Sequence, residues 1–140
     1  MERKELPPGA VGTASRVVAE SDLASALSDE HAVSFPRVFA TARMVALMEL
    51  AAARAMAPVL NEGELSVGVS IDVVHSAATP EGATVRAHAR FTGMEGEFYR
   101  FEVSAEDEGG EIGRGSHQRA AIERARLLAG AERRRPSQSG

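Results

Sequence analysis

Apolar residues between about Ala40 and Ala57 recur at the spacing of one helix face. Placed at the angular step of an α-helix, they fall within one arc of about 140°. They are Met44, Leu47, Met48, Ala51, Ala52, Ala55 and Val59. The stretch is rich in Ala, Met and Leu, which favour helix, and Pro58 and the sequence 61–63 (Asn-Glu-Gly) supply its end. The pattern predicts one long amphipathic helix with a broad apolar face.

From Leu65 onward the period of the apolar positions changes to two, which is typical of strands. In the first of these segments one face holds Val67, Val69, Ile71, Val73 and His75, and the other holds Gly68, Ser70, Asp72 and Val74. Three more predicted strands follow at residues 83–91, 98–105 and 111–122, and a weaker one precedes the helix at residues 11–18. Residues 19–36 show no clean period, so we expect them to form a loop.

The order of strand, long helix and four consecutive strands predicts an α+β domain whose strands pair antiparallel, because short turns join them. A twisted antiparallel sheet can wrap around one Ala-rich helix, since alanines let the helix approach the strands closely. This arrangement is the hot-dog fold, whose single sheet usually needs a second copy, so we expect a homodimer. We place the domain at residues 11–123, with a loose segment at 1–10 and a basic, flexible tail at 124–140.

Composition narrows the possible functions. The 140 residues suit a single domain, and the absence of cysteine excludes disulfides, thiolate metal sites and a cysteine nucleophile. Residues 1–123 carry 11 basic and 19 acidic groups. This net negative charge argues against nucleic-acid binding, because it repels a phosphate backbone. The sequence shows neither a signal-peptide core nor an apolar segment that suits a bilayer span. We therefore expect no membrane association and a cytoplasmic location.

Glu49 is the most informative polar side chain of the predicted helix. It is the only acid between His31 and Asn61, and its neighbours four residues away are Val45 and Ala53, so no cation on its own helix can pair with it. A carboxylate in such surroundings is costly unless another element supplies a partner or its pKa rises. A partly exposed position at the edge of the helix is the simpler alternative.

Two further side chains could join Glu49 in a reactive group. His75 ends the apolar face of its strand, where a histidine is often a core residue with its hydrogen bonds satisfied. Thr41 lies near the start of the helix, where it could be an N-cap. Together, a hydroxyl, a carboxylate and an imidazole offer nucleophilic or general-base chemistry.

The other polar positions are weaker candidates. His88 shares a face with arginines and His31 lies in a polar loop, so we expect both in solvent. His117 and Arg119 share one face of the last strand with two glycines, which leaves open backbone around them. The Arg-rich tail could touch RNA or a coenzyme phosphate, although a disordered solubilising end explains it more simply. No metal-ligand spacing, phosphate loop or dinucleotide fingerprint is present, so we expect neither a metal nor a cofactor.

Several motifs resemble those of the fluoroacetyl-CoA thioesterase family of hot-dog proteins. The similarity covers roughly residues 10–123 without large gaps. It is carried by residues 35–41 (Phe-Pro-Arg-Val-Phe-Ala-Thr), 44–49 (Met-Val-Ala-Leu-Met-Glu), 54–58 (Arg-Ala-Met-Ala-Pro), 75–80 (His-Ser-Ala-Ala-Thr-Pro), 111–113 (Glu-Ile-Gly) and 117–120 (His-Gln-Arg-Ala). The glutamate on the helix and the His-x-Ala-Ala-Thr-Pro sequence at the strand end are the most specific of these.

The resemblance implies roles for particular residues. The catalytic threonine, glutamate and histidine of the family correspond to Thr41, Glu49 and His75. Its substrate-binding positions correspond to a lid phenylalanine at Phe35, a glycine next to the acyl group at Gly68 and an active-site arginine at Arg119. The implied reaction is hydrolysis of a short acyl-CoA thioester at a dimer interface, with coenzyme A as part of the substrate. Four arginines are candidates for its phosphates, namely Arg37, Arg43, Arg114 and Arg119.

Two other functions fit the same expected fold. A non-catalytic protein could bind acyl-CoA or an acyl carrier without releasing the thiol. A hot-dog dehydratase or hydratase usually has an aspartate five positions before a histidine, and none of the four histidines has one there. The sequence therefore favours the thioesterase first, the binding protein second and the dehydratase last.

Overall fold

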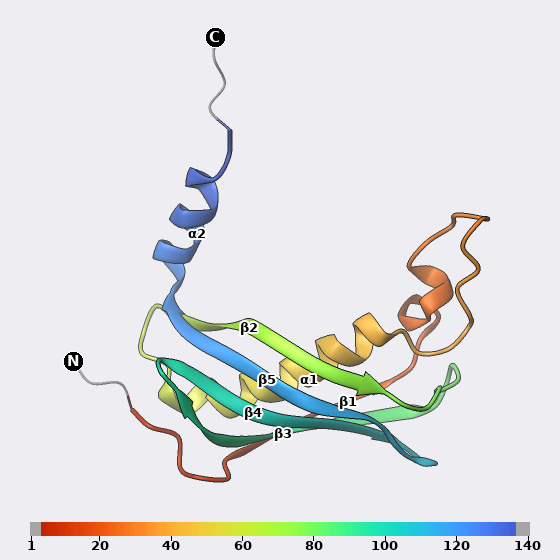
Figure 1. The fold of residues 1–140 in the computed structure, drawn as a ribbon, viewed down its shortest axis with the longest axis horizontal. Coiled ribbons are helices and arrows are strands. Elements are labelled where there is room, and N and C mark those ends of the chain that lie inside the picture. The colour runs from red at the N-terminus through yellow and green to blue at the C-terminus, as the bar shows by residue number, and fades with distance from the viewer. Residues whose placement is uncertain (1–3, 137–140) are drawn as a thin grey trace.

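The computed structural model describes residues 4–136, so the outer ends of the expected loose segment and tail, residues 1–3 and 137–140, lie outside the described residues. The first elements in chain order are strand β1 and two short 3-10 turns, and one long helix then precedes the remaining strands (Figure 1). The elements are β1 (Val11–Val17), η1 (Glu20–Asp22), η2 (Ala24–Ala26), α1 (Thr41–Met56), η3 (Ala57–Val59), β2 (Glu64–His75), β3 (Thr84–Glu95), β4 (Phe98–Asp107), β5 (Gly110–Glu123) and α2 (Arg124–Arg133).

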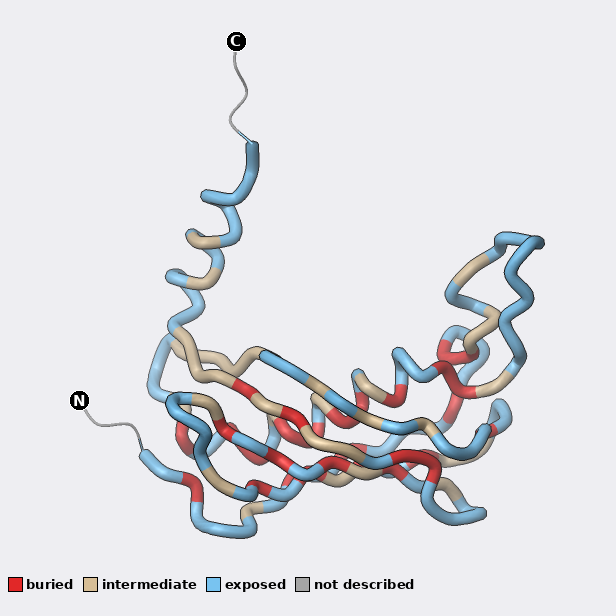
Figure 2. Tube along the Cα trace, viewed as in Figure 1, coloured by how far each residue is buried: buried red, intermediate tan, exposed pale blue. Residues whose placement is uncertain are grey.

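The strands form one antiparallel sheet in the order β1-β3-β4-β5-β2. The sheet curves along α1, and the buried positions line the surface between the helix and the strands (Figures 1 and 2). The predicted hot-dog fold is therefore confirmed. Within the described range, no helix is both long enough and apolar enough to cross a membrane.

Alanines bring α1 close to the sheet, as the sequence predicts. Ala51 and Ala52 are fully buried, and Ala55 is nearly so. The closest approach is at Gly12 of β1, where a Cβ atom would lie 2.0 Å from the carbonyl oxygen of Ala51 and 2.8 Å from the amide nitrogen of Ala55. Any side chain at Gly12 would therefore collide with helix backbone, which cannot move aside as a flexible side chain could.

A β-bulge in β2 changes the faces that simple alternation predicts. Pairing with β5 shifts register between Gly68 and Ser70, so Val69 is the extra residue. Gly68 then faces α1, because a Cβ on it would meet Glu49, while Ile71 pairs with the buried His117. Simple alternation along the sequence places Gly68 and His75 on opposite faces. The bulge puts both on the helix side.

Both ends of the chain differ from their predictions. Leu6 is buried in the core, so the segment before β1 is anchored by this side chain instead of lying loosely on the surface. After β5, residues 124–133 form helix α2 where the sequence analysis expects a flexible tail. No residue of α2 is buried, and the helix projects away from the sheet (Figures 1 and 2).

Candidate active site

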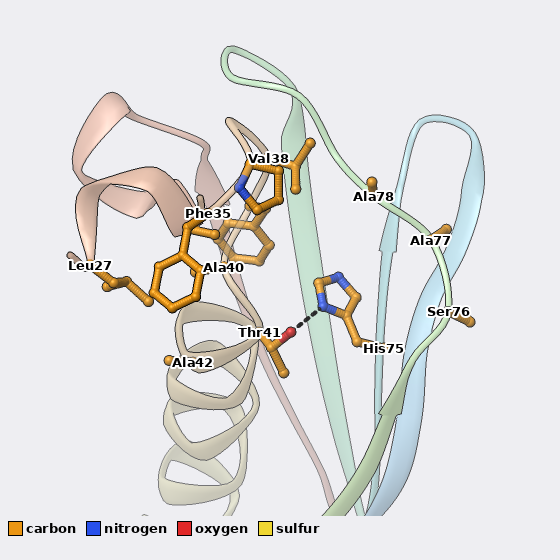
Figure 3. A pocket seen from close by; sticks show the side chains of 13 residues that line it. Leu27, Phe35, Val38, Ala40, Thr41, Ala42, His75, Ser76, Ala77 and Ala78 are labelled. Atoms are coloured by element: carbon orange, nitrogen blue, oxygen red, sulfur yellow. Dashed lines mark hydrogen bonds between the residues drawn. The ribbon is translucent and has the colours of Figure 1, made fainter. Parts of the chain in front are cut away.

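Thr41 and His75 meet at the start of α1. The Thr41 Oγ1 atom lies 2.8 Å from Nδ1 of His75, a hydrogen-bond distance (Figure 3). Ala40 holds the N-cap position instead of Thr41, so the hydroxyl is free to bond the imidazole. Thr79 links the segment after β2 to the segment before α1, because its carbonyl accepts from the amide of Phe39 at 2.8 Å. Its hydroxyl donates to Asp107 of β4.

A pocket of about 480 Å³ opens beside this pair. Its walls come from the loop before α1, the first residues of α1 and the segment after β2 (Figure 3). Phe35 is 42% exposed and lines the pocket, and its role as a lid stays a prediction. The Nε2 atom of His75 is buried and has no hydrogen-bond partner among the described residues. It is the polar atom that a bound molecule could satisfy here.

Glu49 finds its cation on β5. Its Oε2 atom accepts from Nη1 of Arg119 at 3.2 Å, and the two side chains are 41% and 6% exposed. Arg119 also donates to the hydroxyl and the carbonyl oxygen of Ser66, each at 3.0 Å. Because these bonds fix the guanidinium, Arg119 holds the carboxylate of Glu49 in one position while leaving part of it open to solvent.

His117 completes this polar group, although the sequence analysis did not choose it. The ring is buried, Nδ1 lies 2.7 Å from the carbonyl oxygen of Ser70, and Nε2 lies 3.1 Å from Nη1 of Arg119. A carbonyl only accepts and a guanidinium only donates, so Nδ1 carries the proton and Nε2 accepts. Burial lowers the pKa of His117, which keeps this neutral form. Its position on the face of Arg119 was the sequence signal available for it.

Gly68 leaves space in front of the Glu49 carboxylate. A Cβ at this position would lie 2.8 Å from Oε2 of Glu49 and 3.4 Å from Cε1 of His117. A second pocket, of about 250 Å³, is lined here by Glu49, Gly68, His117 and the bulged part of β2. Gly68 therefore lies in front of Glu49, and its contact with an acyl group stays a prediction of the resemblance.

The expected catalytic trio is divided within one chain. Thr41 and Glu49 are eight residues apart on α1, which corresponds to about 12 Å along the helix axis. The larger pocket contains Thr41 and His75, and the smaller one contains Glu49. Thr41 and His75 are therefore brought together, as are Glu49, Gly68 and Arg119, but the structure does not bring Glu49 to His75.

Across residues 4–136, no group of three or more histidine, aspartate or glutamate side chains could hold a metal ion. The arrangement instead offers a carboxylate fixed by an arginine and an imidazole with one free nitrogen. Such groups suit attack on a carbonyl carbon and proton transfer to its leaving group.

Comparison with known proteins supports the fold. A hot-dog-like protein of Thermanaerovibrio acidaminovorans has the same fold, with a TM-score of 0.81 at 22% identity over 95% of this chain and 96% of that chain. A structure of the fluoroacetyl-CoA thioesterase FlK gives a TM-score of 0.87 at 42% identity over 95% of this chain and 100% of that chain. A variant of FlK in complex with acetyl-CoA gives 0.86 at 42% identity, over 93% and 99% of the two chains.

The fold and these matches define a hot-dog protein. The model of the family described as fluoroacetyl-CoA-specific thioesterase matches residues 18–125, and the chain belongs to this family. The fluoroacetyl-CoA thioesterase of Streptantibioticus cattleyicolor is 53% identical over 88 residues, which are 63% of this chain and 63% of that relative. The matched part thus spans less than two thirds of that curated relative.

Proposed function

We propose that the chain hydrolyses the thioester of a small acyl-CoA to the free acid and coenzyme A. The observation that carries this is the Glu49 carboxylate, fixed by Arg119 in front of Gly68 and still partly open to solvent. Membership of the family and the acetyl-CoA bound by the FlK variant support the substrate class. No cofactor takes part in this proposal.

Each group has a task in the reaction. Glu49 either attacks the thioester carbonyl carbon or removes a proton from the water that does so, and the carbon–sulfur bond then breaks. In the first route the acyl group is left on Glu49 as an anhydride, and one water then hydrolyses this anhydride to release the acid and the carboxylate of Glu49. When Thr41 donates to Nδ1 of His75, Nε2 carries a proton and can donate it to the acyl oxygen or to the departing thiolate. Hydrolysis consumes one water, whose oxygen ends in the acid and whose protons are divided between the thiol and the medium.

A homodimer supplies what one chain lacks. β2 is an edge strand of 12 residues, and such an edge is a template for pairing with another strand. The face of α1 that carries Glu49 is open beside it, with Ala42 and Ala46 exposed and Val45 half-buried. A two-fold axis beside β2 would join both surfaces and run the two helices in opposite directions. Glu49 of one subunit then approaches the Thr41 end of the other.

The division of the trio supports a shared site. About 12 Å between Thr41 and Glu49 along one helix is too far for both to act on one carbonyl group. When the two α1 helices run antiparallel, the Glu49 of one subunit lies close to the Thr41 and His75 of the other. The distance along a single helix then no longer separates the three groups. We therefore assign each active site one Glu49 from one subunit and the Thr41–His75 pair from the other. A cytoplasmic location remains a prediction of the sequence.

A thiol-trapping assay with acetyl-CoA, fluoroacetyl-CoA and phenylacetyl-CoA tests the function. The unmodified chain should release thiol from at least one of them, and Glu49→Ala should reduce kcat by at least about 10²-fold. Glu97→Ala, the same substitution at an exposed position of the turn between β3 and β4, is the matched control and should keep full turnover. Tight acyl-CoA binding without thiol release, or normal turnover by Glu49→Ala, would contradict the proposal.

A further inference from the structure

Helix α2 is a basic element with no place in the core of its own chain. It follows β5, none of its residues is buried, and Leu128 is 58% exposed. A helix of 10 residues is marginal in water without packing partners. Its exposed leucine and its arginines therefore indicate a contact outside the chain to which it belongs.

The arginines at this end differ from most others in their pairing. Every arginine that the sequence suggests for coenzyme A is engaged with a carboxylate: Arg37 with Glu81, Arg43 with Asp22, Arg114 with Glu111 and Arg119 with Glu49. In contrast, Arg124, Arg126, Arg133 and Arg134 have no carboxylate within ion-pair distance among residues 4–136. Their donors are free for an anion that the chain does not itself provide.

Helix α2 lies too far from the Thr41–His75 pocket of its own subunit to contact a molecule bound there. The amide of Arg124 donates to the carbonyl of Gly63, and Glu123 pairs with Glu64, so α2 starts beside the first residue of β2. His75 is the last residue of that strand, about 36 Å away at 3.3 Å per residue. An arginine side chain cannot cover that distance. In Figure 1, α2 rises at one end of β2 and the loop before α1 rises at the other.

A second copy reverses this relation. If β2 pairs antiparallel with the same strand of a partner, the start of one β2 lies beside the end of the other. Helix α2 then stands next to the partner's His75 end, where the segment after β2 and the loop before α1 form the larger pocket. Helix α2 and the loop before α1, which both project from the sheet in Figure 1, would then lie on either side of the partner.

We propose that the arginines of α2 bind the phosphate groups of the coenzyme A whose acyl end occupies the partner subunit's pocket. The inference rests on the proposed function, which supplies the substrate. Coenzyme A carries a diphosphate and a 3′-phosphate, and guanidinium groups bind phosphate through paired charge-assisted hydrogen bonds. From residue 19 to residue 34 the chain has no lysine or arginine, and Arg37 later in the loop before α1 is paired with Glu81, so α2 supplies unpaired positive charge that this loop lacks.

Binding to coenzyme A and to pantetheine, which lacks the phosphates, tests the proposal by calorimetry. The variant Arg124→Gln/Arg126→Gln/Arg133→Gln removes three charges and keeps residues that favour helix. It should weaken coenzyme A binding about tenfold and leave pantetheine binding unchanged. Replacing the same residues with lysine should restore most of the affinity. The matched control is Arg86→Gln, an exposed arginine of β3 that is unpaired among residues 4–136 and should change neither affinity.

Subunit mixing tests whether α2 binds coenzyme A in the pocket of the partner subunit. The glutamine variant is mixed with an excess of His75→Ala chains, so that almost every active pocket belongs to a glutamine-variant subunit with an unmodified α2 on its partner. The KM for acyl-CoA should then return to the unmodified value. A KM that stays raised means that α2 serves the pocket of its own subunit and overturns the proposal.

In the binding experiment, equal weakening of coenzyme A and pantetheine also overturns the proposal, because the helix would then act on the loop and not on phosphate. Loss of thiol release with these binding differences intact would contradict the proposed function alone.

Discussion

Gly68→Ala perturbs the reactive carboxylate with a single methyl group. The new Cβ would lie 2.8 Å from Oε2 of Glu49, and an ordinary contact is about 3.4 Å. The oxygen has to move by about 0.6 Å to relieve the overlap. Its bond to Arg119 is already 3.2 Å long, so any part of this shift that points away from Arg119 weakens the bond.

The cost to folding should be small. The colliding atom is the end of a flexible side chain that is 41% exposed, so it can rotate away without moving the backbone. Alanine also reduces the freedom of the unfolded chain, which contributes about 0.4–1 kcal/mol in the opposite direction. We expect the free energy of unfolding in urea to change by less than about 1 kcal/mol.

The cost to catalysis should be large, since misplacing a reacting group by about 1 Å can lower the rate about 10²-fold. We expect Gly68→Ala to lower kcat for thioester cleavage by about 10- to 100-fold, with a folded dimer by circular dichroism and gel filtration. Full turnover by the variant would refute the placement of Glu49 in front of Gly68. Unfolding of the variant would refute the small folding cost.

Three other substitutions separate structural from chemical roles. Gly12→Ala places a methyl group 2.0 Å from the backbone oxygen of Ala51, so it should destabilise the fold by more than about 3 kcal/mol in urea unfolding, and a smaller loss would contradict the packing. Arg119→Met removes the partner of Glu49 and should lower both kcat and, by about 1–3 kcal/mol, stability; unchanged turnover would count against the pair. Burial lowers the pKa of His117, so the unfolded chain takes up a proton below about pH 6.5 that the folded chain does not, and stability falls as the pH drops. His117→Gln should therefore reduce the difference between urea midpoints at pH 7.5 and 5.5, and an unreduced difference would show that other groups cause it.

The sequence predicts the fold well because periodicity records burial. The helix face from Met44 to Ala55 and the alternation in the strands from Thr84 onward both appear as expected. No cation lies four residues from Glu49 on α1, which left open a partner from another element or a partly exposed position, and the structure has both, since Glu49 pairs with Arg119 and is 41% exposed. These inferences depend on local spacing, which a sequence contains directly.

The faces within β2 depend on a feature that spacing does not contain. One extra residue at Val69 reverses the alternation, so Gly68 joins the side of His75. A glycine inside a strand is a sign of a bulge, but it does not say at which residue the register shifts. His117 became part of the site because Ser70 and Arg119 satisfy both of its ring nitrogens, which only the paired strands bring together. Helix α2 was missed although half of its ten residues are alanine or leucine, because none of them is buried and no packed face marks the segment as part of the domain.

Mixing two inactive variants tests the shared active site most directly. Glu49→Ala and His75→Ala chains are each expected to be inactive alone. In a 1:1 mixture half of the dimers are mixed, and in each of these one site has both an intact Glu49 and an intact Thr41–His75 pair, so about one quarter of the unmodified activity should return. If all three residues acted within one chain, no mixed dimer would contain a complete site. Absence of recovered thiol release, with subunit exchange verified, would contradict the shared site.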